Sequence, residues 1–324
     1  MVRTLIQTDG GAVSAPPFGL STIGALGALL VFALSGTGLA GPGVTLAAAL
    51  AIILLGLPHG AYDLQLLVKP RPGRRLPDWR LAAAYLGLLG CAAALWLLAP
   101  SAALLIFLVM AAVHFGEDWT MLEAGLLRHM SGFSIIAAVT IASPADVGVL
   151  FGLLSNAPFG ALLARAIIMA APIVLLVSLV AMALATARGH WRWSLAHLIA
   201  LAIALISPPV VGFAAYFVLI HSAIHLRAAR TALAHWPLAR FCLYGLGISA
   251  LSLGAMLLAH PRVALPDDLR WPLIVFQLLA ILTVPHLLLT HRLMPGLDRW
   301  LARGDVSGHN KRADSVVLPA LPNG

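Results

Sequence analysis

Five histidines stand inside long apolar stretches, where an ionisable side chain is costly and rarely lacks a function. They are His59, His114, His221, His225 and His286. A neutral imidazole is a ligand for iron, zinc or copper, so the first chemistry that these residues suggest is metal binding. His221 and His225 are four positions apart, which on a helix places both rings on one face and suits two ligands of one ion.

Carboxylates follow two of these histidines at the same spacing. Asp63 lies four residues after His59, and Asp118 lies four residues after His114. A metal-bound histidine usually donates its second ring N–H to a carboxylate or a carbonyl. We therefore expect Asp63 and Asp118 to stand behind the ligands, on the same helix or across helices, or else to be ligands themselves. We expect Glu117 to be solvated at the membrane surface.

Other residues flank the clusters without a fixed role. His286 follows Pro285, and it is either a fifth residue of the site, behind the ligands, or a packed polar side chain. Four aromatic residues lie beside the histidines, and they either line an apolar substrate channel or simply pack: Tyr62, Phe115, Tyr216 and Phe217.

The composition is that of a polytopic helical membrane protein rather than a soluble one. Of 324 residues, 61% are hydrophobic and 10% are charged, and the mean hydropathy is +0.97. The formal net charge of +8 comes mostly from arginines in short loops, which indicates membrane topology and lipid contact and argues against nucleic acid. The two cysteines, Cys91 and Cys242, lie in apolar stretches, so we expect neither a disulfide framework nor a thiolate metal site.

The elements that must position the histidines are transmembrane helices. Runs of roughly 20 apolar residues predict an all-α bundle of about ten spans. The predicted spans are 18–36, 44–68, 80–99, 101–118, 126–143, 160–187, 191–207, 209–227, 239–259 and 272–291. The spans at 126–143 and 191–207 are the weakest, so eight is the alternative. Residues 1–17 form a polar leader, 18–292 the membrane domain, and 293–324 a polar tail predicted to be disordered.

Basic residues collect on one side of this bundle. They gather after the second, sixth, eighth and tenth spans, which places both termini in the cytoplasm and the protein in the cell (inner) membrane. The histidine-bearing spans are the second, fourth, eighth and tenth, so all four run from outside to inside. Each histidine falls in the inner half of its span. The sequence therefore predicts that the five histidines meet at one depth, near the cytoplasmic leaflet.

Three other functions use similar residues. A membrane non-haem di-iron enzyme, of the desaturase or hydroxylase type, needs more histidines than the one His-x3-His pair provides. A haem-binding electron carrier usually holds its histidine pairs at two depths. A proton-coupled transporter would use intramembrane histidine and aspartate as a relay, and metal content would separate it from an enzyme.

In this order, the clusters resemble the signature blocks of the Brp/Blh family of membrane β-carotene 15,15′-dioxygenases. The blocks are Pro58-His59-Gly60-Ala61-x-Asp63, His114-Phe115-Gly116-x-Asp118, Tyr216-Phe217-x3-His221-Ser222-x2-His225 and Pro285-His286. The resemblance runs from about residue 45 to 292. The N-terminal leader and the arginine-rich loop after Lys69 have no counterpart in it.

The resemblance implies an iron(II) enzyme that splits the central double bond of β-carotene, or of a related carotenoid, with O2 to give two molecules of retinal. By position, His59, His114, His221 and His225 match the iron ligands of that family. Asp63, Asp118 and His286 would then lie behind them. The retinal would supply a rhodopsin-type protein.

Overall fold

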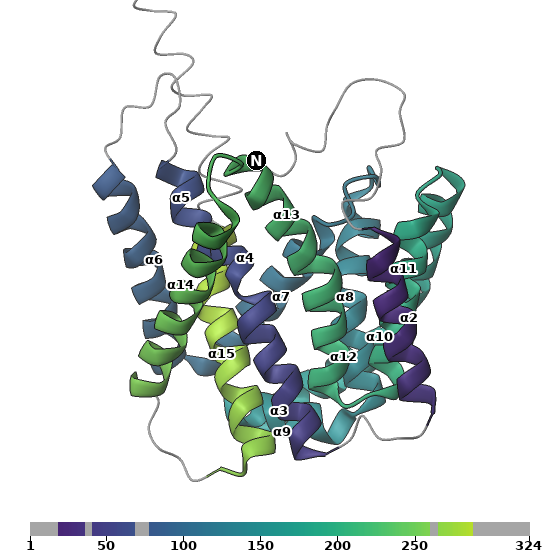
Figure 1. Cartoon of the computed structure of the whole chain (residues 1–324). Helices are drawn as coiled ribbons and strands as arrows, with labels where there is room; N and C mark the ends of the chain where they lie inside the picture. Colours follow the sequence, from purple (N-terminus) through teal and green to yellow (C-terminus); the bar gives the residue numbers. More distant parts are fainter. Residues whose placement is uncertain (1–18, 36–40, 69–77, 260–264, 288–324) are drawn as a thin grey trace, which may run out of the picture.

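The computed structural model describes residues 19–35, 41–68, 78–259 and 265–287, so the predicted leader and tail lie outside the described residues. Every regular element in this part of the chain is a helix, which confirms the all-α class (Figure 1). The first helices are α2 (Leu20–Leu34), α3 (Pro42–Ala51), the π-helix η1 (Ile52–Gly56), α4 (Pro58–Ala61), α5 (Asp63–Val68), α6 (Asp78–Leu98), α7 (Pro100–Gly116) and α8 (Gly125–Ala142). They are followed by α9 (Pro144–Leu154), α10 (Ala157–Ala187), α11 (Trp191–Ile206), α12 (Pro209–Tyr216), the π-helix η2 (Phe217–Ser222), α13 (Ala223–Ala232), α14 (Leu238–Ala259) and α15 (Asp267–Leu287).

Each of the ten predicted spans coincides with helix, but fewer of these helices have the full length of a span. Among the described residues, seven helices are long and apolar enough to cross a membrane by length and composition. Shorter apolar helices are found at Leu20–Leu34, Pro100–Gly116, Pro144–Leu154 and Trp191–Ile206. The count of ten spans therefore stays a prediction.

Helix α9 occupies a stretch that the sequence predicts to be a connection. Pro144 stands at the start of the helix and Asp146 in its first turn, and both are favourable positions at a helix N-terminus. Val147, Leu150, Phe151 and Leu154 are buried on one side of the helix. The helix is shorter than a membrane span, so the length of its apolar stretch does not predict it. The helical spacing of its apolar residues is the feature of the sequence that indicates it.

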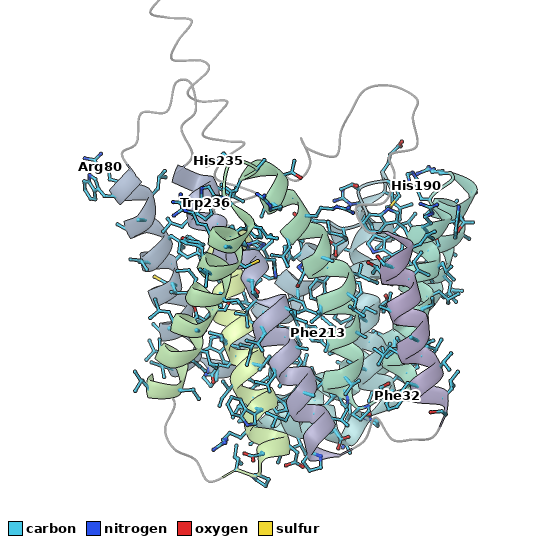
Figure 2. The ribbon with its side chains drawn as sticks, viewed as in Figure 1. Phe32, Arg80, His190, Phe213, His235 and Trp236 are labelled. Carbon is cyan, nitrogen blue, oxygen red and sulfur yellow. The ribbon has the colours of Figure 1, made fainter. Side chains whose placement is uncertain are left out.

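The outside of the bundle is apolar and its ends are polar. Leu258 is 90% exposed and Met169 80% exposed, and many other large hydrophobic side chains face outwards from α6, α10 and α14. Exposed apolar surface on this scale marks contact with a membrane or a partner. Figure 2 shows Arg80, His190 and His235 at one end of the bundle.

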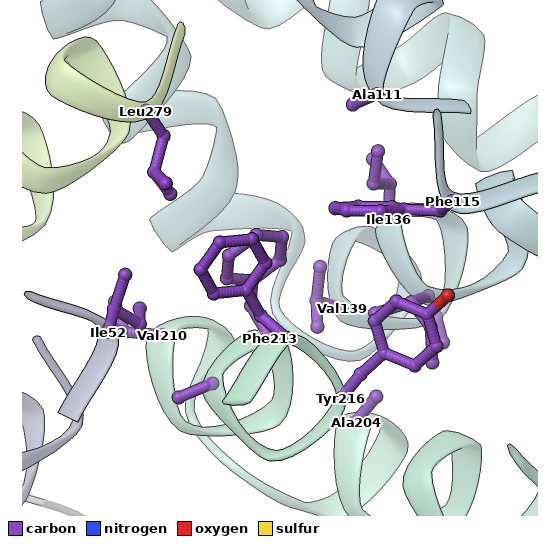
Figure 3. Close-up of a cluster of buried hydrophobic side chains, with 14 of the residues drawn as sticks. Ile52, Ala111, Phe115, Ile136, Val139, Ala204, Val210, Phe213, Tyr216 and Leu279 are labelled. Atoms are coloured by element: carbon purple, nitrogen blue, oxygen red, sulfur yellow. The ribbon is translucent and has the colours of Figure 1, made fainter. Parts of the chain in front are cut away.

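Three of the histidine-bearing stretches share one direction. In Figure 1 the stretch α3 to α5, the stretch α12 to α13 and α15 all run towards the end that carries Arg80 and His235 in Figure 2. The core beneath the histidines is packed from several of these helices. Figure 3 shows Phe213 of α12 with Phe115 of α7 and Leu279 of α15 in this buried cluster.

Two π-helical turns interrupt the helices beside the histidines, and such turns are frequent at functional sites. In η1 the Leu57 N–H bonds to the Ile52 carbonyl, and the Gly60 N–H then bonds to the Leu57 carbonyl. Pro58 has no N–H to continue the regular pattern. The Gly56 carbonyl is thereby released from its usual helical partner, the N–H of Gly60. The second π-turn, η2, contains His221 itself.

Candidate metal centre

The five histidines lie around one point inside the bundle. They come from α4 (His59), α7 (His114), η2 (His221), α13 (His225) and α15 (His286). The ring of His221 lies 4.5 Å from those of His114 and His225 and 5.1 Å from that of His59, measured between centroids. The ring of His286 lies 4.8 Å from that of His114. The structure thus brings together all the histidines that the sequence predicts to share one depth.

Two overlapping sets of these rings have metal-binding spacing. One consists of His59, His114 and His286, and the other of His114, His221 and His225. Within each set the potential ligand atoms all lie within 4.8 Å of one another. Two nitrogens on one ion, at about 2.1 Å each, lie at most about 4.2 Å apart. Small side-chain adjustments therefore suffice to bring either set onto an ion, and His114 belongs to both.

Three of the rings make a close contact through Nδ1, at 2.6 to 2.9 Å, which leaves Nε2 as the atom that can bind a metal. His221 Nδ1 lies 2.9 Å from Asp118 Oδ2, and His286 Nδ1 lies 2.6 Å from Asp63 Oδ2. His59 Nδ1 lies 2.6 Å from the Gly56 carbonyl that the π-turn released. An Nδ1–H that donates to a carboxylate or carbonyl fixes the tautomer in which Nε2 can bind a metal.

The Nε2 atom of His221 gives the most direct evidence that these residues fit an ion. It is buried and has no hydrogen-bond partner. An unsatisfied buried nitrogen carries a desolvation cost, and such atoms are rare in folded proteins unless an ion or a ligand completes them. The donor set is all imidazole, which suits iron, zinc or copper. The residues present therefore fit a transition metal.

The aspartates serve histidines from other helices, not the ones four residues before them. Asp118 Oδ1 lies 3.4 Å from His225 Nε2, and the Tyr216 hydroxyl donates to Asp118 Oδ2 at 3.0 Å. Asp118 is buried, and it follows the end of α7. Its contacts with His221 and His225 therefore connect α7 to the η2–α13 segment. Asp63 likewise reaches across to α15. The contacts that Asp118 and Asp63 make with histidines His221 and His286 are therefore contacts across helices.

Glu117 is a site residue that sequence reasoning assigned to solvent. Its Oε2 lies 3.3 Å from His114 Nδ1, and its side chain is only 26% exposed. The expectation of a solvated Glu117 is therefore wrong, because α7 ends at Gly116 and the following turn directs this carboxylate back to the ring. Tyr85 was also missed: its hydroxyl lies 3.5 Å from Asp63 Oδ2, and no motif in the sequence points to it.

An apolar pocket of about 370 Å³ begins at the histidines. Its walls include His59, His114 and His286 together with apolar side chains such as Phe107 and Leu279. Ligand sites of this size, apolar with a few convergent polar groups, are typical of small-molecule binding. A second, smaller cavity of about 40 Å³ shares Phe107, Ala111 and Phe213 with the first. These shared side chains separate the two spaces.

The four aromatic residues predicted for a channel divide into two pairs. Phe115 and Phe217 line the pocket. Tyr62 instead lies in a separate cluster with Trp236 and Phe241, stacked on the Phe241 ring, and its hydroxyl donates to the Phe241 carbonyl at 2.7 Å. Tyr216 is fully buried with its hydroxyl on Asp118. The channel hypothesis is therefore corrected for both tyrosines, because their polar ends are held by other partners.

His197 shows that a buried histidine in this bundle can also be structural. Its Nε2 lies 2.9 Å from the Ser134 hydroxyl, and its ring packs edge-on against Trp119. This matches the packing and hydrogen-bonding role that is the simplest interpretation of a lone histidine in a span.

The comparison with known proteins agrees with this geometry. No curated protein and no solved structure matches the chain. A family model described as beta-carotene 15,15'-dioxygenase matches residues 50–294, which is more than half of the chain and contains all five histidines of the site and both aspartates. The chain therefore belongs to the beta-carotene 15,15'-dioxygenase family.

Proposed function

We propose that this protein is a membrane-embedded, iron(II)-dependent dioxygenase that cleaves the central 15,15′ double bond of β-carotene to give two molecules of retinal. The observation that carries the proposal is the position of the histidine cluster at the wall of an apolar pocket. Family membership supports the carotene substrate and the use of O2. The reaction balances with O2 alone, since the carbon–carbon double bond breaks and each of its two carbons takes one oxygen atom.

The histidines supply the binding site for the metal. We assign His59, His114, His221 and His225 as ligands, and we add His286 as a candidate fifth donor because its ring is oriented by Asp63 as a ligand's would be. A bound iron(II) ion would supply the activation of O2. The protein's own part is to orient the imidazoles through Asp118, Asp63 and the Gly56 carbonyl.

The pocket determines which double bond of the polyene lies next to the histidines. A conjugated hydrocarbon offers no hydrogen-bonding group by which one double bond differs from the next. Site choice must therefore come from the shape and length of the cavity, which places one bond near the metal. The pocket suits this task because two of its hydroxyls are satisfied within their own helices: Ser249 donates to the Gly245 carbonyl at 2.9 Å and Thr283 to the Leu279 carbonyl at 2.7 Å.

The bilayer is the natural location for this reaction, because the substrate dissolves in lipid and the outside of the bundle is apolar. We propose the cell (inner) membrane with both termini in the cytoplasm, on the basis of the arginine-rich loops. The histidine cluster would then lie in the cytoplasmic half of the bilayer.

The geometry argues against a haem carrier. Bis-histidine haem ligation needs two rings on opposite faces of a flat macrocycle, with the space between them open. Here five rings crowd around one point, and the distances between their centroids start at 4.5 Å. A porphyrin plane has no room among them.

The proposal is tested in bacteria that make β-carotene. The intact protein is expressed beside His221→Ala and a matched control, His235→Ala, which removes an exposed histidine outside the cluster. Extracted pigments are separated by chromatography, and the metal content of the purified proteins is measured. We expect loss of carotene, appearance of retinal and bound iron in the intact protein and the control only. Intact carotene in cells with iron-loaded protein would refute the substrate, and absence of any metal would refute the enzyme.

A further inference from the structure

The histidine pocket reaches the outer surface of the bundle between two helices. Leu86 of α6 and Leu251 of α14 both line the pocket, yet they are 63% and 69% exposed. A side chain that borders a cavity and also faces outwards stands at the mouth of that cavity. The same pocket is lined at its other end by the buried rings of His114 and His286. One continuous space therefore connects the outside with the candidate metal centre.

The mouth opens on the part of the surface that contacts hydrocarbon. Both helices are among those long and apolar enough to span a membrane, at Trp79–Leu98 and Leu238–Leu258. Leu86 and Leu251 lie within these stretches, further along their helices than the ends near Arg80 and His235, which Figure 2 shows at the polar end of the bundle. A ligand that passes between them comes from the acyl-chain region of the bilayer, without crossing the aqueous interface.

The wall of α14 explains why there is room at this place. It presents the small side chains Ser249, Ser252 and Ala255 to the pocket, opposite Leu86 and Leu89 of α6. Small residues leave space where two helices would otherwise interdigitate. Both α6 and α14 pack against α15, which therefore lies between them and keeps them apart.

From these observations we propose that the gap between α6 and α14 is a lateral portal, through which an extended apolar hydrocarbon passes from the lipid phase to the histidine centre. The occupant is a long hydrocarbon with no polar group to satisfy, since the lining beyond the histidines is almost entirely apolar. The inference rests on the proposed function only in its choice of natural ligand, a carotenoid.

The test blocks the mouth chemically in protein that has already folded. Cys91 and Cys242, which are both exposed, are first replaced by alanine. Leu251→Cys is then introduced at the mouth, and Met169→Cys, on the outward face of α10, serves as the matched control. Each protein is reconstituted into phosphatidylcholine vesicles and treated with a bulky pyrene maleimide.

Two measurements follow on the same samples. In the first, a long-chain hydrocarbon that carries a diazirine is photolysed in the vesicles, and mass spectrometry maps its insertion into the pocket side chains Phe107 and Leu279, which are buried. In the second, retinal formation from β-carotene in the vesicles is timed. We expect modification at position 251 to lower insertion at both interior residues several-fold, with no change after modification at position 169.

The outcomes separate the portal from the assigned substrate. Interior insertion that persists after modification at position 251, or that is absent from the unmodified protein, would overturn the portal. Insertion that depends on position 251, in a protein that forms no retinal, would uphold the portal and remove β-carotene as the substrate. If both insertion and retinal formation fall together, both proposals stand.

Discussion

The Nδ1 atom of His286 lies 2.6 Å from Oδ2 of Asp63, although 223 positions separate the two residues in the chain. This contact ties the last described helix, α15, to the start of α5 and holds the ring of His286 among those of the other histidines. The nearest carboxylate in sequence to His59 thus orients a ring from the far end of the chain.

His286→Ala should reduce bound iron to the same extent as His59→Ala, because the two residues occupy the same three-histidine set with His114. The measurement is the ratio of metal to protein after purification. His129→Ala, which removes a histidine that is absent from both sets, is the control. A His286→Ala protein with full metal content and normal turnover would show that this ring only packs beside the centre.

Asp118→Asn should weaken metal binding by about 10- to 100-fold, the usual effect of losing a carboxylate behind a metal-bound histidine. Asp118 contacts both His221 and His225, so its loss disturbs two ligands at once. Competition with a chelator of known affinity gives the change. Tyr216→Phe, which removes only the hydroxyl that holds Asp118, should show a smaller effect in the same direction. Unchanged affinity in Asp118→Asn would contradict the assigned role.

Phe213→Leu should change which double bond is cleaved. Phe213 stands between the main pocket and the small cavity of about 40 Å³, so a smaller side chain lets the polyene insert more deeply. We expect asymmetric apocarotenals to appear beside retinal in the chromatogram. Phe133→Leu, a partly buried phenylalanine on α8, is the matched control and should leave the product pattern unchanged. A Phe213→Leu enzyme that forms retinal alone would show that this wall does not set the position of cleavage.

Gly132→Ala should destabilise the protein, because a Cβ at this position would overlap with the backbone of α7 at Ala112, Phe115 and Gly116. Forcing an additional carbon into a packed interface costs about 1–3 kcal/mol. The strain would fall next to His114, so metal content should fall together with the thermal unfolding temperature. Gly148→Ala, where no atom lies within 4 Å of the added carbon, should leave both unchanged. Equal unfolding temperatures for the two variants would exclude the close contact.

The sequence predicted the site to a large extent, since five residues of one type in apolar stretches are recognisable without any structure. The common direction of four spans further predicted that these residues meet. The sequence could not decide whether Asp63 orients the ring of His59 or the ring of another histidine. A spacing of four permits the first arrangement, but only the position of α15 shows that the second one forms.

Some contacts of the site are not indicated by any motif in the sequence. Tyr85 reaches Asp63 because α6 packs beside α5. Tyr62 and Tyr216 flank the motifs in sequence, yet their hydroxyls are bound by the Phe241 carbonyl and by Asp118, away from the pocket. For Tyr62, adjacency in the chain says little about where the side chain points, because the π-helical turn η1 precedes it and changes the helical register of the residues that follow.

The sequence by itself determined the helical class, the apolar segments and the identity of the histidines, because run length and residue type are local properties of the chain. The tertiary structure decided which carboxylate orients which ring, which aromatic side chains border the pocket, and where the pocket opens. These features depend on contacts such as His221 with Asp118, 103 positions apart, and on the gap between α6 and α14. Helix periodicity does not encode such contacts, because they arise only when the helices pack against one another.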